Sequence, residues 1–304
     1  MKKASHARSI LYSVYFYVVF FVVSHLYFYY GRLKFGHFKR NPHNVERWRE
    51  HALRFVDALF FLTAVRVRAE GLSSLPEDPV IFAANHQSHL DGLIIFHVIR
   101  RPFTAVTGPF NIFPRIVREW FEHMGYMSVA RNVFEELRYR DTVRLGHAAD
   151  RCRDILQKGT SILIFPEGRH EFKHHLLPFH LGVARMALET RALVIPVVLE
   201  HADTFLPTTS HLLTPTRITV KICAPVKLWE ISKNELVDTI YLEQEIKKRL
   251  PKSYFTEKSV PHCLQGVRAA FFDLDDTLTR RNVFIHVTER YLLGHPDVHV
   301  FGKL

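Results

Sequence analysis

The chain has few cysteines and lacks the short motifs of several kinds of catalytic or metal site. Cys152, Cys223 and Cys263 show no Cys-x-x-Cys spacing in 304 residues, which argues against a disulfide framework or a zinc site and fits a reducing compartment. No His-Glu-x-x-His or Gly-x-Ser-x-Gly sequence is present, so neither a zinc hydrolase nor a nucleophile-elbow serine enzyme is indicated.

Acidic residues are also outnumbered, with 30 Asp+Glu against 41 Lys+Arg. This balance favours an anionic partner such as a phosphorylated substrate, an anionic membrane surface or nucleic acid. The basic residues are not clustered with aromatic residues in a recognised nucleic-acid motif, so we expect no nucleic-acid partner.

Charge is absent from Ile10–Tyr30, which contains no Asp, Glu, Lys or Arg. A run of about 20 apolar residues can cross the hydrocarbon core as one helix, and tyrosines at its end suit the membrane interface. No small-residue cleavage site follows, which disfavours a signal peptide, while a buried core helix is the alternative. We expect residues 1–44 to form a membrane anchor and basic connector, single-pass or interfacial. The basic residues after the run favour a catalytic domain on the cytoplasmic side.

Beyond the anchor, apolar runs typical of strands alternate with helical patterns. Residues 45–61 predict an amphipathic helix, whose apolar stripe we expect in the membrane interface rather than on the protein core. Strands are expected at 64–71, 79–84, 161–165, 192–199 and 217–226, and helices at 91–99, 182–190 and 235–250. This order predicts an α/β domain over 45–250, with a mostly parallel or mixed sheet flanked by helices. We expect residues 251–266 to form a linker.

Two polar motifs stand just past expected buried strands. His86 and Asp91 follow the run at 79–84, and Glu167 follows the run at 161–165. A His-x4-Asp spacing arises by chance about once in a chain of this composition, but carboxyl ends of strands form the ligand crevice of an open α/β sheet. A neutral His86 can act as general base towards an attacking hydroxyl, which indicates acyl transfer. Asp91 either orients the imidazole or caps the next helix, and both can hold at once.

Four ordered blocks within about residues 45–250 resemble those of the glycerolipid acyltransferases, which include 1-acylglycerol-3-phosphate acyltransferase. The blocks are NHQSHLD (85–91), GYMSVAR (125–131), FPEGRH (165–170), and LPFHLGVARMA (177–187) with VIPV (194–197). The resemblance implies a membrane-bound enzyme with His86 as base and Asp91 as its partner. It implies acyl-CoA or acyl carrier protein as donor, a lysophospholipid as acceptor, membrane lipids as partners, and no cofactor or metal ion for the transfer.

The same resemblance implies a set of substrate-binding residues, with Arg131 holding the acceptor phosphate through its guanidinium. The set is Asn85, Arg131, Glu167, Gly168, Arg169 and His170. The third block departs from the family pattern, because Arg169 stands one place ahead of the usual arginine and His170 takes its position. Which of the two reaches the phosphate stays open.

The segment FFDLDDTLT (271–279) resembles the first motif of haloacid-dehalogenase-type phosphohydrolases. That resemblance implies Asp273 as nucleophile and Asp275 as acid/base around Mg²⁺. Because only 25 residues (304 − 279) follow Thr279, we expect 267–304 to be the truncated start of such a domain, with Mg²⁺ needed only if the domain is complete. A phosphohydrolase acting through Asp273 and a catalytically inactive membrane adaptor are the alternatives to acyl transfer.

Overall fold

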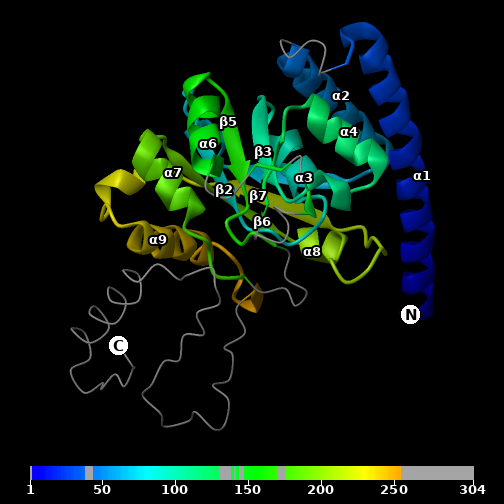
Figure 1. The fold of residues 1–304 in the computed structure, drawn as a ribbon. Helices are drawn as coiled ribbons and strands as arrows, with labels where there is room; N and C mark the ends of the chain where they lie inside the picture. The colour runs from blue at the N-terminus through cyan, green and yellow to red at the C-terminus, as the bar shows by residue number, and fades with distance from the viewer. Residues whose placement is uncertain are drawn as a thin grey trace. The chain divides into compact units, whose positions relative to one another are not determined.

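The short apolar runs of the sequence form the centre of a seven-stranded sheet in a computed structural model of the chain (Figure 1). The structure describes residues 2–37, 44–130, 138–139, 142–143, 147–169 and 176–254. The strands are β1 (Arg66–Glu70), β2 (Ile81–Ala84), β3 (Phe103–Thr107), β4 (Met127–Ser128), β5 (Ser161–Ile164), β6 (Val194–Glu200) and β7 (Arg217–Ile222). Their spatial order is β1-β7-β6-β2-β5-β3-β4, and only β6 and β7 pair antiparallel.

Strand β2 lies between β5 and β6, parallel to both. All residues of these three strands are buried, as continuous apolar runs predict for strands covered on both faces. Parallel strands end at the same edge of a sheet, so the segments that follow β2, β5 and β6 are brought together there.

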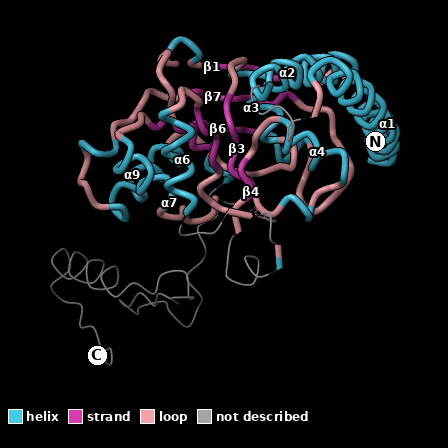
Figure 2. Tube along the Cα trace, turned by 45° about the horizontal axis from the view of Figure 1, so that its top comes forward, coloured by secondary structure: helices cyan, strands magenta, loops and turns pink. Residues whose placement is uncertain are grey.

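Helices cover both faces of the sheet (Figure 2). Phe82 and Ala84 face a core shared with α1 (Lys2–Phe35), α2 (Val45–Leu62), α3 (Asp91–Ile99) and α4 (Arg115–His123). Ile81 and Ala83 point the other way, into a core shared with α6 (Ala148–Gln157), α7 (Gly182–Thr190) and α9 (Glu235–Lys247). Helix α8 (Ala202–Phe205) and four 3-10 turns complete the described elements: Leu72–Ser74, Phe110–Ile112, Leu228–Glu230 and Lys252–Tyr254.

The predicted α/β class with a mixed, mostly parallel sheet is confirmed, as are five of its strands and the helices at 91–99, 182–190 and 235–250. Strands β3 and β4 were not predicted. β4 has only two residues and β3 follows α3 after a short turn, so their extended form depends on pairing along the β5 edge rather than on a local pattern.

One long side of α1 packs against the domain. Phe16 and Phe28 are 1% and 0% exposed, and the Phe28 ring lies 5.6 Å from Trp48 and 5.5 Å from Trp120 between centroids. The Trp120 indole also donates to the Ser24 hydroxyl at 3.0 Å. The other side of α1 exposes large apolar residues: Leu11, Val14, Val18, Phe21, Val22, Leu26 and Leu33. By length and composition alone, the His6–Phe35 part of this helix could cross a membrane.

The prediction that the apolar stripe of α2 lies in the membrane interface was wrong. Trp48, Phe55 and Leu59 on this stripe are 0–4% exposed, because α1, α3 and α4 pack over the helix. Sequence periodicity marks an apolar face but does not say whether protein or lipid covers it.

Residues Met1–Phe255 form one compact unit. Within it, Tyr254 is 5% exposed and donates its hydroxyl to Asp203 at 2.9 Å, so the beginning of the expected linker packs on the α/β domain. The expected phosphohydrolase motif with Asp273 and Asp275 lies outside the described residues and stays a prediction.

If α1 is part of the folded unit, Phe28→Ala will lower stability far more than Phe21→Ala. Removing a fully buried phenylalanine costs about 3–5 kcal/mol, whereas an exposed one on the same helix costs less than about 0.5 kcal/mol. The melting temperature of each variant in a mild detergent measures the difference. Equal small shifts would show that α1 does not pack on the domain.

Candidate active site

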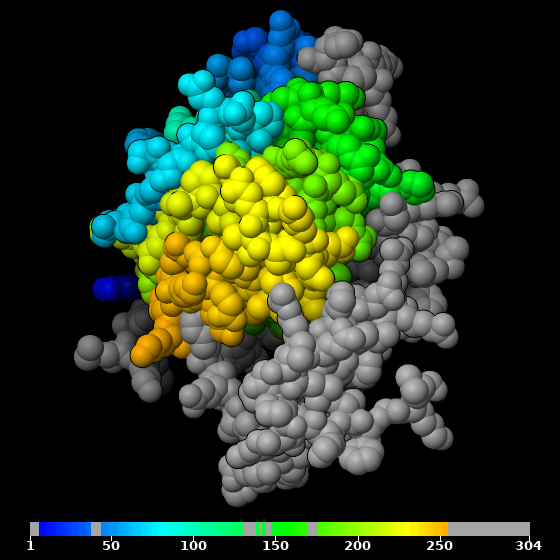
Figure 3. Space-filling view, turned by 90° about the vertical axis from the view of Figure 1, so that its left-hand side faces the viewer, coloured from blue at the N-terminus to red at the C-terminus, as the bar shows by residue number. Residues whose placement is uncertain are grey.

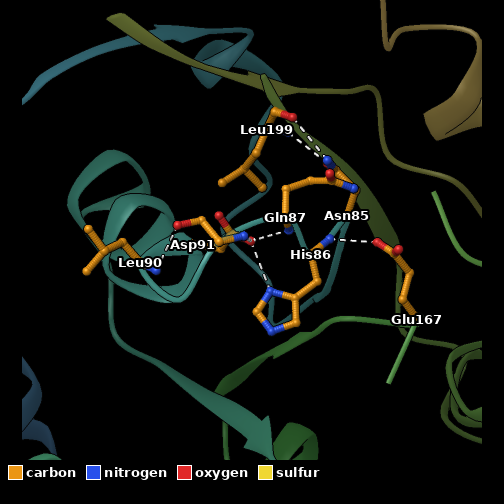
Figure 4. Close-up of polar contacts among 8 residues, drawn as sticks. Asn85, His86, Gln87, Leu90, Asp91, Glu167 and Leu199 are labelled. Carbon is orange, nitrogen blue, oxygen red and sulfur yellow. Dashed lines mark hydrogen bonds and ion pairs between the residues drawn. The ribbon is translucent and has the colours of Figure 1, made fainter. Parts of the chain in front are cut away.

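The chain leaving β2 is fixed to β6 by a side-chain amide. Asn85 is fully buried; its Nδ2 donates to the Leu199 carbonyl at 3.0 Å, and its Oδ1 accepts from the Leu199 N–H at 2.8 Å (Figure 4). The pair of bonds takes the place of backbone pairing where β2 has ended. Asn85 therefore sets the direction of the turn that carries His86; contact with substrate stays a prediction.

Three donors converge on one carboxylate oxygen in this turn. His86 Nδ1 lies 2.9 Å from Asp91 Oδ2, which also accepts from the backbone N–H groups of Gln87 at 2.6 Å and Ser88 at 2.8 Å. Asp91 is fully buried and is the first residue of α3. Because a carboxylate only accepts hydrogen bonds, Nδ1 carries the proton and the lone pair of the ring is on Nε2.

The carboxylate does not cap the helix in the expected way. Leu90 occupies the N-cap position, without a side-chain cap, and the N–H groups that Asp91 binds belong to the preceding turn. The structure thus brings the predicted pair together, with Asp91 holding both the turn and the imidazole.

The surroundings keep His86 neutral. Its side chain is 17% exposed, and burial together with the smaller effect of His89 lowers the pKa of His86 to about 3. The Phe165 ring stacks on the imidazole, with centroids 3.9 Å apart and 16° between planes. A neutral imidazole held on one side by Asp91 and covered on a face by Phe165 can accept a proton at Nε2.

Glu167 connects the two strand ends. It is 1% exposed; one oxygen accepts from the His86 N–H at 2.6 Å and the other from the Leu177 N–H at 2.8 Å. Burial raises the pKa of Glu167 to about 8, and these two N–H groups oppose that rise. Glu167, predicted to bind substrate, is placed as a support for the backbone of His86.

Gly168 permits the tight turn after Glu167. Its φ is +67°, and a Cβ there would lie 2.9 Å from the His180 ring. The neighbouring Arg169 is exposed and close enough to His180 to help lower the pKa of that histidine, an effect to which burial contributes most. Arg131 and His170 lie outside the described residues, so the proposed phosphate contacts stay predictions.

The sequence did not predict several contacts that hold His86 and Asp91, the candidate catalytic dyad. The sequence pattern predicts Phe165 at the end of a strand but not its stacking on His86, and residue type does not predict which backbone N–H groups, here those of Gln87, Ser88 and Leu177, bind the two carboxylates. Among the described residues, no three His, Cys, Asp or Glu side chains gather as metal ligands.

Comparisons with known proteins agree on one family. Residues 66–200 match the Acyltransferase family model. A 1-acyl-sn-glycerol-3-phosphate acyltransferase of Cocos nucifera is 27% identical over 60% of this chain and 58% of its own length. The chloroplastic enzyme LPAT1 of Arabidopsis thaliana is 29% identical over 48% of this chain and 39% of its own. The chain thus spans about half the length of the curated relatives it matches.

The fold has a solved counterpart. The crystal structure of the 1-acyl-sn-glycerophosphate acyltransferase from Thermotoga maritima superposes with a TM-score of 0.64 and 22% identity. The match covers 80% of this chain and 95% of that one, so it supports the overall architecture. Residues 66–200 therefore match the acyltransferase family, and the chain is homologous to 1-acyl-sn-glycerol-3-phosphate acyltransferases.

Proposed function

We propose that this protein transfers a fatty acyl group from an acyl thioester, of coenzyme A or of acyl carrier protein, to the hydroxyl of a lysophospholipid such as 1-acylglycerol 3-phosphate. The observation that carries the proposal is the 2.9 Å contact between His86 Nδ1 and buried Asp91 at the carboxyl end of β2. The homologues' names supply the substrate class, and the net charge of +11 suits an anionic acceptor.

The proton path follows from the tautomer. Nε2 of His86 takes the proton of the acceptor hydroxyl while the hydroxyl oxygen attacks the carbonyl carbon of the thioester. The new C–O bond forms, the C–S bond breaks, and the imidazolium returns the proton to the leaving thiolate. Asp91 does not take up the proton; it keeps the ring oriented and stabilises the transient positive charge.

Phe165 contributes to the same step through its ring face. An aromatic face attracts a cation, so the stacked ring favours the imidazolium as it forms while occupying one side of the imidazole. Burial acts in the opposite direction and lowers the pKa of His86, which keeps the resting imidazole neutral.

We propose that the N-terminal helix holds this chemistry at a membrane. Tyr12, Ser24 and Phe28 on α1 each contact the α/β domain, so the domain lies along much of the helix and lipid cannot surround it. We therefore propose that α1 lies in the interface with its exposed apolar side in the acyl layer, rather than crossing the bilayer as its length alone suggested. A lipid acceptor would then reach the site without leaving the membrane surface.

His86→Ala should reduce acyl transfer to 1-acylglycerol 3-phosphate by at least about 10²-fold, because the general base is lost. The measurement is transfer from radiolabelled acyl-CoA to lysophosphatidate by purified protein in mixed micelles. His97→Ala is the matched control, since His97 also pairs with an aspartate, Asp57, at 2.7 Å but lies at the end of α3 away from the strand ends. Unchanged activity in His86→Ala would refute His86 as the general base, whereas no transfer by the parent protein would favour an inactive adaptor.

Glu167→Gln should lower both stability and turnover. Each carboxyl oxygen accepts a backbone N–H, and an oxygen can do so whether or not the group is protonated, whereas an amide nitrogen cannot accept. One buried N–H is left unsatisfied, which costs about 1–3 kcal/mol and loosens the backbone of His86. The expected result is a lower melting temperature with a reduced kcat; a variant as stable and active as the parent would refute the supporting role.

A further inference from the structure

Exposed cations gather where the end of α1 meets the beginning of α2. Lys34 lies in the last turn of α1, and Arg47 and Arg54 are seven residues apart on one side of α2. All three side chains line a hollow of about 290 Å³ together with Phe35, Glu50 and His51. This is close to the lower end of the volumes that small-molecule sites have, about 300 Å³.

The three cations have no carboxylate partner within ion-pair distance in the part of the chain that the structure describes. Glu50 lies between the two arginines and is the one acidic lining residue, so the hollow carries a net charge of +2 from these four side chains. Nearby arginines differ: Arg49 binds Glu46 at 2.5 Å, and Arg100 binds Asp57 at 3.0 Å. The cations of the hollow are thus available to an anionic ligand.

The floor of the hollow adds no competing charge. His51 is 4% exposed and its Nε2 bonds the Tyr27 carbonyl at 2.7 Å. Burial, and less strongly the charges of Arg54 and Lys34, lower the pKa of His51, so its ring is neutral.

Apolar surface adjoins the hollow directly. Tyr30 and Leu33 on α1 are 54% and 88% exposed, and the Lys34 ammonium lies 5.6 Å from the centre of the Tyr30 ring. With α1 in the plane of the interface as proposed above, its exposed apolar residues face the acyl chains and the cations beside them lie at the level of the lipid phosphates. A soluble phosphate compound has no acyl chains that would contact these exposed apolar residues.

We propose that Lys34, Arg47 and Arg54 form a binding site for the phosphate group of an anionic phospholipid of the bilayer, distinct from the acyl-transfer site at the strand ends. The two sites belong to different parts of the fold: this one lies between α1 and α2, whereas the dyad follows β2. The ligand is a lipid that holds the protein on the membrane, whether or not it is ever a substrate.

The test is co-sedimentation of the full chain with vesicles of phosphatidylcholine alone or mixed with phosphatidylglycerol. Arg47→Glu/Arg54→Glu should weaken binding to the anionic vesicles by about tenfold or more and leave the weaker binding to phosphatidylcholine unchanged. Arg47→Gln/Arg54→Gln should show a smaller loss in the same direction. Raising the salt concentration should reduce the difference between parent and variants.

The matched control is Arg151→Glu/Lys233→Glu, which makes the same change of net charge. Arg151 on α6 and Lys233 ahead of α9 are exposed. α6 and the segment ahead of α9 contribute to the face shown in Figure 3, green and yellow there, where α1 appears only at the edges in dark blue. This control should bind anionic vesicles as well as the parent does. If it lost as much binding as Arg47→Glu/Arg54→Glu, general surface charge would explain the effect and the proposal would be overturned.

Two further arms separate the alternatives. Inorganic phosphate at constant ionic strength should not displace the protein from anionic vesicles; efficient displacement would point to a soluble phosphate ligand and refute the lipid assignment. His86→Ala should bind the vesicles like the parent, so failure of the proposed acyl transfer leaves this result intact. The site would also be refuted if both arginine double variants kept the parent's preference for anionic vesicles over phosphatidylcholine vesicles.

Discussion

A single buried carboxylate oxygen holds the candidate site together. Asp91 Oδ2 receives the Nδ1–H of His86 and two N–H groups of the turn between β2 and α3, so ring orientation, tautomer and turn shape have one common anchor. Removing the carboxylate would release all three at once. Asn85 and Glu167 extend this arrangement to the ends of β6 and β5, because they bind the backbone of Leu199 and of His86. The geometry of His86 and Asp91 therefore depends on the ends of the neighbouring strands as much as on the local sequence motif.

The second constraint is that α1 has two apolar sides, one buried against the domain and one exposed. Phe16 and Phe28 pack on the domain, whereas Leu26 and Leu33 are exposed. A helix in this situation is bound to the domain by one side and offers the other to lipid, which accounts for an apolar composition around its whole circumference. In the proposed placement of α1 in the interface, the cations at its end lie at the level of the lipid phosphates, so the lipid-binding proposal and the proposed acyl transfer describe one orientation on the membrane.

Local patterns were sufficient for much of this structure but not for all of it. Short apolar runs in the sequence predict buried parallel strands such as β2 and β5. Because parallel strands end at the same edge of a sheet, His86, Asp91 and Glu167 could be assigned to that edge. The stacking of Phe165 and the backbone donors to Asp91 depend on three-dimensional approach, which residue type does not encode. The stripe of α2 was misassigned for a related reason: periodicity identifies an apolar face without identifying what covers it.

The central claim is that Asp91 fixes His86 as a neutral imidazole with its proton on Nδ1 and its lone pair on Nε2. Nitrogen-15 NMR of histidine-labelled protein, with the His86 signals assigned by their loss in His86→Ala, measures this directly. The account predicts a protonated Nδ1 and an unprotonated Nε2 at neutral pH. Because burial lowers the pKa of His86, this state should persist as the pH falls below the ordinary histidine value of about 6.5. A proton on Nε2, or an imidazolium at neutral pH, would contradict it.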